Sequence, residues 1–321
     1  MARPVIACKT DGKQEQAVVQ EFLQMLGPET TLPVAAIKVL IGVIARSNAS
    51  TIMGMERELR QTADLLLDSV VLHAKSTIAL SSGCELFLRY VTRCSLDFPN
   101  FEDCKKQVLH RGEKFAEMSV TSRVRIAELG HGFVRDGAVI MTHGYSRVVA
   151  SLLLRAAQTK HFTIMIPEGR PEGAGFEAAA VFSKAGIPVS VILDSAVGYF
   201  MEQVDLCVVG AEGVVENGGV VNKVGTCQMA VVAKALHKPF YVAAESYKFA
   251  RLYPLNQRDL PEGRTPMIRL DPVGGEPAPP GVDCTNPCVD YTPADYITLL
   301  FTDLGVLTPS AVSDELIRLY Q

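Results

Sequence analysis

Residues 206–226 read LCVVGAEGVVENGGVVNKVGT and carry the strongest indication of the fold. The run from Leu206 to Val209 is short and apolar, as expected of a strand that a parallel sheet buries on both faces. Five glycines follow it up to Thr226, which predicts a long polar loop at the carboxyl end of that strand. Ligands of open α/β sheets bind at that end, so we expect a binding crevice there. The alternative is a glycine-rich connection that only turns the chain.

The expected loop is rich in polar side chains. They could serve a polyhydroxylated, anionic ligand, and they are Glu212, Glu216, Asn217, Asn222 and Lys223. Three further polar segments follow other expected strands, and these are 142–147, 168–171 with Gly175, and 194–198. A crevice lined by Arg170, Lys223, Asn222, Ser146 and helix N-termini would suit a phosphate. Each piece has a simpler alternative: Arg170 as a solvated loop residue, His143 as a structural histidine and Asp194 as a helix N-cap.

The composition is that of an ordinary globular protein and excludes several classes. The chain has 321 residues, 48% of them hydrophobic, and its 31 basic and 35 acidic side chains leave a net charge of −4. We therefore expect no direct nucleic-acid partner and no membrane partner. No apolar run reaches the length of a membrane span, and Met1 to Lys13 lack the apolar core of a secretory signal.

The eight cysteines are scattered and form no C-x-x-C pair, so we expect neither a zinc site nor another metal, and reduced thiols as in the cytosol. A nucleophilic role for Cys227 is disfavoured because no histidine is near it in sequence. The G-x-G-x-x-G, P-loop, H-E-x-x-H and G-x-S-x-G motifs are absent from the expected positions, which disfavours classical NAD and NTP binding and leaves no cofactor to expect.

Residues up to about 135 follow helical periodicity, without a strand signal. The expected helices are Gln14–Leu26, Pro33–Arg46, one capped by Ser50 and reaching Lys75, Glu85–Cys94 after Ser81-Ser82-Gly83, one capped by Asn100, and Ser122–Arg135. From Asp136, short β-branched runs alternate with helical patterns. The expected strands are 138–142, 162–166, 188–193, 206–209, 239–243 and 297–302, and the expected helices are 146–158, 176–185, 195–203, 227–236 and 311–320.

This alternation predicts an α/β protein with an N-terminal helical domain, 1–130, followed by a Rossmann-like domain, 131–321. The second domain should contain a doubly wound parallel sheet of about six strands. Residues 251–293 are rich in Pro and Gly, so we expect a long excursion that is mobile or packed on a partner.

Two motifs carry a family resemblance. E-x-R-P-x-x-x-G is met by Glu168, Arg170, Pro171 and Gly175, and N-G-x-x-x-N-K-x-G-T by the residues from Asn217 to Thr226. Together they resemble the regulatory subunits of eukaryotic translation initiation factor 2B and the related isomerases of methylthioribose 1-phosphate and ribose 1,5-bisphosphate. The match spans nearly the whole chain from Pro33 onward. Residues 142–147, 244–249 and 300–316 are similar to one subunit of that factor in particular.

The departures from the isomerases concern the chemistry. Where the isomerases have a cysteine after T-H, this chain has Gly144, and where they have the aspartate of G-A-D it has Glu212. Arg170, Asn222 and Lys223 keep the positions that recognise the sugar phosphate. The resemblance therefore implies a non-catalytic pocket for a sugar phosphate or nucleotide monophosphate. The alternatives are a vestigial crevice and an active aldose-phosphate isomerase.

The resemblance also implies partners. It implies a homodimer joined through the α/β domains, with the exposed parts of 247–253 and 297–320 as candidate contacts. That dimer would bridge two copies of a guanine-nucleotide exchange assembly with beta, gamma, delta and epsilon subunits. The helical domain would sense the phosphorylated alpha subunit of initiation factor 2 and slow exchange under stress.

Overall fold

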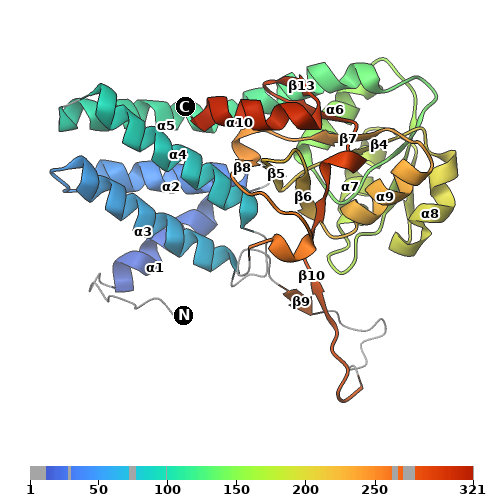
Figure 1. The fold of residues 1–321 in the computed structure, drawn as a ribbon, viewed down its shortest axis with the longest axis horizontal. Helices are drawn as coiled ribbons and strands as arrows, with labels where there is room; N and C mark the ends of the chain where they lie inside the picture. The colour runs from blue at the N-terminus through green and yellow to red at the C-terminus, as the bar shows by residue number, and fades with distance from the viewer. Residues whose placement is uncertain are drawn as a thin grey trace.

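Helices gather at one end of the molecule and a helix-covered sheet forms the other end (Figure 1). The computed structural model describes residues 12–27, 30–71, 77–98, 100–261, 267–269 and 279–320. The helical end consists of α1 (Gly12–Met25), α2 (Leu32–Arg46), α3 (Ile52–Val71), α4 (Ile78–Asp97) and α5 (Phe101–Gly130). In the described part of this region no strand precedes Val139, as expected from the sequence.

An apolar core holds the five helices together. Helix α2 lies at its centre, with Ile37, Leu40 and Ile44 completely buried. Phe22 of α1 and Leu59 of α3 are buried in the same cluster. These side chains recur every three or four residues along their helices, and this spacing gives each helix one apolar face to bury.

The N-cap predictions for the helical region had mixed outcomes. Asn100 caps α5 as expected, because its Oδ1 accepts hydrogen bonds from the amides of Glu102 and Asp103. Ser50 is not the N-cap of α3; the hydroxyl of Thr51 accepts the amide of Gly54 at 3.2 Å. The expected end of that helix at Lys75 lies outside the described residues.

Two helices are longer than the sequence predicts. Residues 81–83 lie inside α4 and not before it. Ser82 is tolerated there because its hydroxyl donates to the carbonyl of Ile78 at 2.9 Å. The segment Ser122–Arg135 is no separate helix either, since α5 runs unbroken from Phe101 to Gly130 and a 3-10 turn follows.

The main sheet has seven strands in the order β13-β12-β7-β4-β1-β2-β3. Their bounds are β1 Val139–Met141, β2 Thr163–Pro167, β3 Val189–Ile192, β4 Leu206–Val209, β7 Phe240–Ala243, β12 Leu299–Thr302 and β13 Gly305–Leu307. All six expected strands are present and pair in parallel. The seventh, β13, is antiparallel and closes a short hairpin with β12 that the sequence analysis missed.

Helices cover both faces of this sheet, which makes it doubly wound. Its helices are α6 (Arg147–Ala157), α7 (Ala174–Lys184), α8 (Val197–Phe200), α9 (Thr226–Ala235) and α10 (Val312–Tyr320). One buried cluster joins α5, α6 and α7 to the sheet, and a second joins α8, α9 and α10 to it. The helix expected at 195–203 is a single turn, α8, between two 3-10 turns. No helix in the described ranges combines the length and apolarity needed to cross a bilayer.

A second, four-stranded sheet was not predicted. Its order is β11-β6-β5-β8, with β5 Gly213–Val215, β6 Val220–Lys223, β8 Phe249–Ala250 and β11 Val289–Thr292. The long polar loop expected at 210–226 is therefore wrong in form: it is a β-hairpin whose turn contains Gly218 at φ +83°. The expected excursion 251–293 also contains strands: β11 pairs with β6, and β9 (Met267–Arg269) pairs with β10 (Thr285–Pro287).

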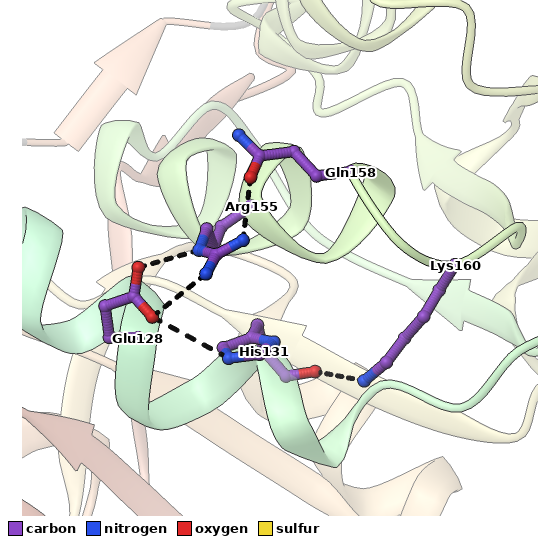
Figure 2. A network of polar contacts seen from close by, with 5 residues as sticks. All are labelled: Glu128, His131, Arg155, Gln158 and Lys160. Carbon is purple, nitrogen blue, oxygen red and sulfur yellow. Dashed lines mark hydrogen bonds and ion pairs between the residues drawn. The ribbon is translucent and has the colours of Figure 1, made fainter.

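A polar network joins the helical end to the sheet (Figure 2). Glu128 of α5 accepts a 2.7 Å hydrogen bond from Nε of Arg155 on α6. Lys160 donates to the carbonyls of His131 and Val134 and so binds the turn that follows α5. Helices α5 and α6 also pack closely at Gly130. A Cβ at that position would lie 2.3 Å from Cδ1 of Leu152, so only a glycine fits without a shift. The division into two domains at residue 130 stays a prediction.

Candidate functional site

All six predicted site residues line two adjoining hollows at the carboxyl edge of the main sheet. The larger, of about 170 Å³, contains Ser146, Glu212, Asn222 and Lys223. The smaller, of about 20 Å³, contains Gly144, Arg170 and again Lys223. Residues from β1, β2 and β4 meet here because parallel strands end at the same edge, while Asn222 and Lys223 come from β6 of the second sheet.

Lys223 is the cation that both hollows share. Its Nζ lies 2.9 Å from Oε1 of Glu172, and the side chain is 29% exposed. Burial lowers the pKa of Lys223, but the hydrogen bond to Glu172 and the charge of Glu212 outweigh it and raise the pKa overall. Lys223 is therefore a fixed positive charge at neutral pH, and it is available to an anion only in competition with Glu172.

A second ion pair lies on the wall of the larger hollow, and sequence reasoning did not single it out. Lys248 Nζ lies 3.0 Å from Oε2 of the buried Glu245, and Tyr247 donates a 2.9 Å hydrogen bond to Oε1. Burial raises the pKa of Glu245, but Lys248 and these hydrogen bonds lower it below its usual value. The pair is thus ionised and internally neutral, so it gives shape and polarity to the site without net charge.

His143 behaves as a structural histidine, the simpler alternative in the sequence analysis. Its Nε2 lies 2.7 Å from the carbonyl oxygen of Val224, and burial lowers its pKa despite that bond. The neutral ring therefore donates from Nε2. Its Nδ1 is buried and has no hydrogen-bond partner in the part of the chain that the structure describes. Gly225 fits against the ring, since a Cβ there would be 3.0 Å from Cε1.

Arg170 lies exposed on the connection between β2 and α7, which Asp194 holds in place. The carboxylate of Asp194 accepts the amides of Gly169 at 2.9 Å and Arg170 at 2.8 Å. The interpretation of Asp194 as an N-cap is wrong, because its carboxylate binds this neighbouring loop and Leu193 occupies the cap position. The peptide bond between Arg170 and Pro171 is cis.

Gly144 leaves room at the place where the isomerases have a cysteine. A Cβ on Gly144 would meet only Cγ of Lys223, at 3.8 Å. The glycine has φ +64°, a conformation that disfavours other residues. The site therefore has space for a thiol but no nucleophile at this position. Glu212, the second departure, is half-buried, and its amide donates to Val221 at 2.8 Å.

Asp290 of β11 is a residue that the sequence analysis missed. Its Oδ2 accepts the amides of Gly225 at 2.7 Å and Cys227 at 3.0 Å, and so caps the N-terminus of α9. Burial raises its pKa to about 7, although these amide hydrogen bonds act in the opposite direction. Asp290 therefore caps one of the helix N-termini that the sequence analysis expected near the crevice. Burial and Asp290 also raise the pKa of the Cys227 thiol, which opposes a nucleophilic role.

Two polar residues of the 210–226 segment do not line either hollow. Asn217 turns away from them and donates to the carbonyl of Pro254 at 2.7 Å and to Oη of Tyr291 at 2.9 Å. Glu216 follows β5, and its amide donates to Leu252. In the described ranges no cluster of His, Cys, Asp and Glu has the arrangement of a metal site. The arrangement can therefore bind an anion through Arg170 and Lys223, with Asn222 beside them.

This fold and site define the class of the protein. The chain belongs to the initiation factor 2 subunit family, whose model matches residues 26–309. It is 47% identical over 312 residues to the translation initiation factor eIF2B subunit alpha of Dictyostelium discoideum, covering 94% of this chain and 96% of that protein. It is 31% identical over 283 residues to the ribose 1,5-bisphosphate isomerase of Archaeoglobus fulgidus, covering 83% and 84%.

A solved structure shows the same fold. One chain of the tetrameric eIF2B-beta2-delta2 complex from C. thermophilum superposes with a TM-score of 0.74 at 15% identity, covering 97% of this chain and 96% of that chain. The family and the fold expected from the sequence are thus confirmed. The higher identity to an alpha subunit than to an isomerase supports a regulatory subunit, and the isomerase alternative is the weaker one.

Proposed function

We propose that the chain is a non-catalytic regulatory subunit of the guanine-nucleotide exchange factor for initiation factor 2, with a pocket that binds a sugar phosphate or nucleotide monophosphate. The observation that carries the pocket is the meeting of Arg170, Asn222 and Lys223 beside Gly144. Two cations and an amide suit a phosphate and its sugar hydroxyls.

The same geometry opposes turnover. Isomerising an aldose phosphate requires a group that moves a proton between neighbouring carbons. Gly144 has no side chain for this step. The neighbouring His143 is hydrogen-bonded to the carbonyl oxygen of Val224, and burial lowers its pKa. Of the two carboxylates that line the larger hollow, Glu245 is paired with Lys248, and Glu212 is the other.

A thermal-shift screen of hexose, pentose and nucleotide phosphates tests the pocket. A ligand at a hundredfold excess over its Kd stabilises the fold by about 2.7 kcal/mol, a shift that is readily measured. Arg170→Ala and Lys223→Ala should each reduce it. If no compound shifts the melting temperature, or if the two variants respond like the wild type, the crevice is vestigial.

The isomerase alternative is kept because the chain is also similar to the Archaeoglobus enzyme. An assay with ribose 1,5-bisphosphate and methylthioribose 1-phosphate separates the two functions. Our proposal expects binding without product, and measurable conversion of either compound would contradict it.

Our proposal includes a homodimer formed through the α/β region. Of the segment 247–253, Tyr247 is buried in the core, and Tyr253, 64% exposed, is the large apolar side chain that is well exposed. Within 297–320, Val306 and Ile317 are the large apolar side chains that reach the surface. Tyr199, 76% exposed on α8, adds a further candidate contact. Sedimentation at micromolar concentration should give twice the 34.8 kDa chain mass, and a species near that mass would count against the dimer.

The proposed partner at the helical end is the phosphorylated alpha subunit of initiation factor 2. A groove of about 410 Å³ between α4, α5 and α10 contains Arg89, Arg93 and Arg318 over an apolar floor that includes Phe115 and Tyr320. Arg318 is paired with Glu315 at 2.6 Å, and Asp97 also lines the groove, so Arg89 and Arg93 with their aromatic neighbours are the groups that suit a phosphorylated segment. Arg89 also donates to the carbonyl of Tyr320 and so helps to form the groove.

The groove is tested by binding phosphorylated and unphosphorylated partner to the purified chain. Arg93→Ala should weaken binding of the phosphorylated form alone, while Lys184→Ala at the far end of α7 is the control. Equal affinity for both forms would contradict the assignment. A pull-down from the cytosolic fraction should recover the beta, gamma, delta and epsilon subunits of the exchange factor, and recovery of the chain alone would oppose the regulatory role.

A further inference from the structure

The carboxylate of Glu172 is paired with Lys223, the cation that lines both hollows. It lies on the connection between β2 and α7, and its Oε1 is 2.9 Å from Nζ of Lys223. Its side chain is 39% exposed, so the contact lies at the mouth of the site and not in the core. A carboxylate oxygen and a phosphate oxygen accept the same hydrogen bond from an ammonium group.

The contact lies in the smaller hollow, which Arg170, Glu172 and Lys223 line together. The Glu172 carboxylate is therefore beside the place where a phosphate would contact both cations. Two anions that share one ammonium group repel each other, so a phosphate bound between Arg170 and Lys223 competes with Glu172 for Lys223.

The backbone of the loop is held on both sides of Glu172, so the competition requires only that the Glu172 side chain rotate. Asp194 fixes the amides of Gly169 and Arg170, and helix α7 begins at Ala174. Glu172 lies between these two fixed points, beside Gly173 with φ +70°. Its hydrogen bond to Lys223 is the side-chain contact that holds the carboxylate inward.

We propose that Glu172 is an internal competitor of the anionic ligand: its carboxylate takes the place of the ligand's phosphate on Lys223, and the ligand binds only as Glu172 turns outward. This inference rests on the proposed function of the pocket. The inference also predicts which ligands the pocket selects. A doubly charged phosphate monoester can replace the Glu172 carboxylate on Lys223, whereas an uncharged sugar cannot. Glu212, the other acidic residue near Lys223, stays in the larger hollow and is not displaced.

Binding of inorganic phosphate and ribose 5-phosphate to the full chain, measured by calorimetry, tests the competition. Glu172→Gln keeps the size of the side chain and removes its charge. We expect the Kd for each anion to fall roughly fivefold, the upper range for a partly exposed ion pair. Glu177→Gln, an exposed glutamate on α7 outside both hollows, is the matched control and should bind like the wild type.

A second measurement needs no ligand. Removal of the Glu172 carboxylate should lower the pKa of Lys223, so that an amine-specific acylating reagent modifies Lys223 faster, as read by mass spectrometry of the peptide that contains it. The Glu177→Gln chain should react at the wild-type rate. An unchanged rate in Glu172→Gln would show that the ion pair does not persist in solution and would overturn the inference.

The outcomes separate this inference from the proposed pocket. Equal Kd values for wild type and Glu172→Gln overturn the competition and leave the pocket standing. Binding that survives Lys223→Ala in the Glu172→Gln background places the anion elsewhere and overturns both. Absence of binding in every variant also overturns both, because Glu172→Gln leaves Lys223 without this competing carboxylate and should have bound phosphate most tightly.

Discussion

Asp290 should make the stability of this protein depend on pH in a way that one substitution removes. Its carboxyl is 8% exposed, and burial raises its pKa from 3.8 to about 7. Because the folded-state pKa lies above the unfolded value, the contribution of this group to stability is fully present below pH 3.8. It is lost as the pH rises through about 7. Asp290→Asn removes the titration but leaves an amide oxygen that can still accept from Gly225 or Cys227.

The size of the effect follows from the two pKa values. Between pH 5 and pH 8 the wild type should lose roughly 2 to 3 kcal/mol of unfolding free energy through this carboxyl, at 1.36 kcal/mol per pKa unit. Asp290→Asn does not lose this contribution, so the difference between the two proteins isolates it from all other titrating groups. The variant should therefore gain on the wild type as the pH rises.

Urea unfolding of both proteins at pH 5, 6, 7 and 8, followed by circular dichroism, measures this difference. Asp205→Asn is a suitable control, because Asp205 also accepts a backbone amide, that of Val139 at 2.7 Å, but at an exposed position. A difference between Asp290→Asn and wild type that is constant from pH 5 to pH 8 would refute the argument. A wild type that gains stability relative to the variant at high pH would reverse its sign.

Three further substitutions test the packing and charges around the site. Lys248→Met should lower the unfolding free energy by about 3 kcal/mol, because it leaves the buried Glu245 carboxylate without its cation. Urea denaturation measures this loss, and the double variant with Glu245→Gln should recover part of it. Gly175→Ala should lower the melting temperature, since its Cβ would lie 2.2 Å from the carbonyl oxygen of Pro167. Gly144→Ala should cost only about 1 kcal/mol, for its positive φ, and a larger loss would show that the space beside Lys223 is not open.

The main sheet could be predicted because its signals are local. Apolar runs such as 206–209 and 162–166 are bounded by turn residues within a few positions, and parallel pairing then brings their carboxyl ends to one edge. This reasoning predicts that Gly144, Arg170 and Lys223 lie close together. Helix boundaries were less predictable. A serine such as Ser82 can lie inside α4 because its hydroxyl donates a hydrogen bond to the carbonyl of Ile78, one turn earlier.

The second sheet could not be predicted, because its strands pair with distant segments. β6 pairs with β11, and the glycines and asparagines of 213–223 indicate a loop until that partner is known. Residues 289–292 were assigned to a Pro/Gly-rich excursion for the same reason. The amide of Gly225 reaches Asp290 across 65 positions, so the cap of α9 was hidden as well.

The sequence by itself therefore determined the family, the order along the chain of the six parallel strands of the main sheet, and which recognition residues lie at its edge, since these depend on motifs and on periodicity over a few residues. Only the tertiary structure decided the charge state of the site. Lys223 meets Glu172 across 51 positions, and Asp290 accepts the amide of Gly225 at the start of α9 across 65 positions. Electrostatic energies depend on distance and burial in space, and sequence spacing specifies neither for residues so far apart along the chain.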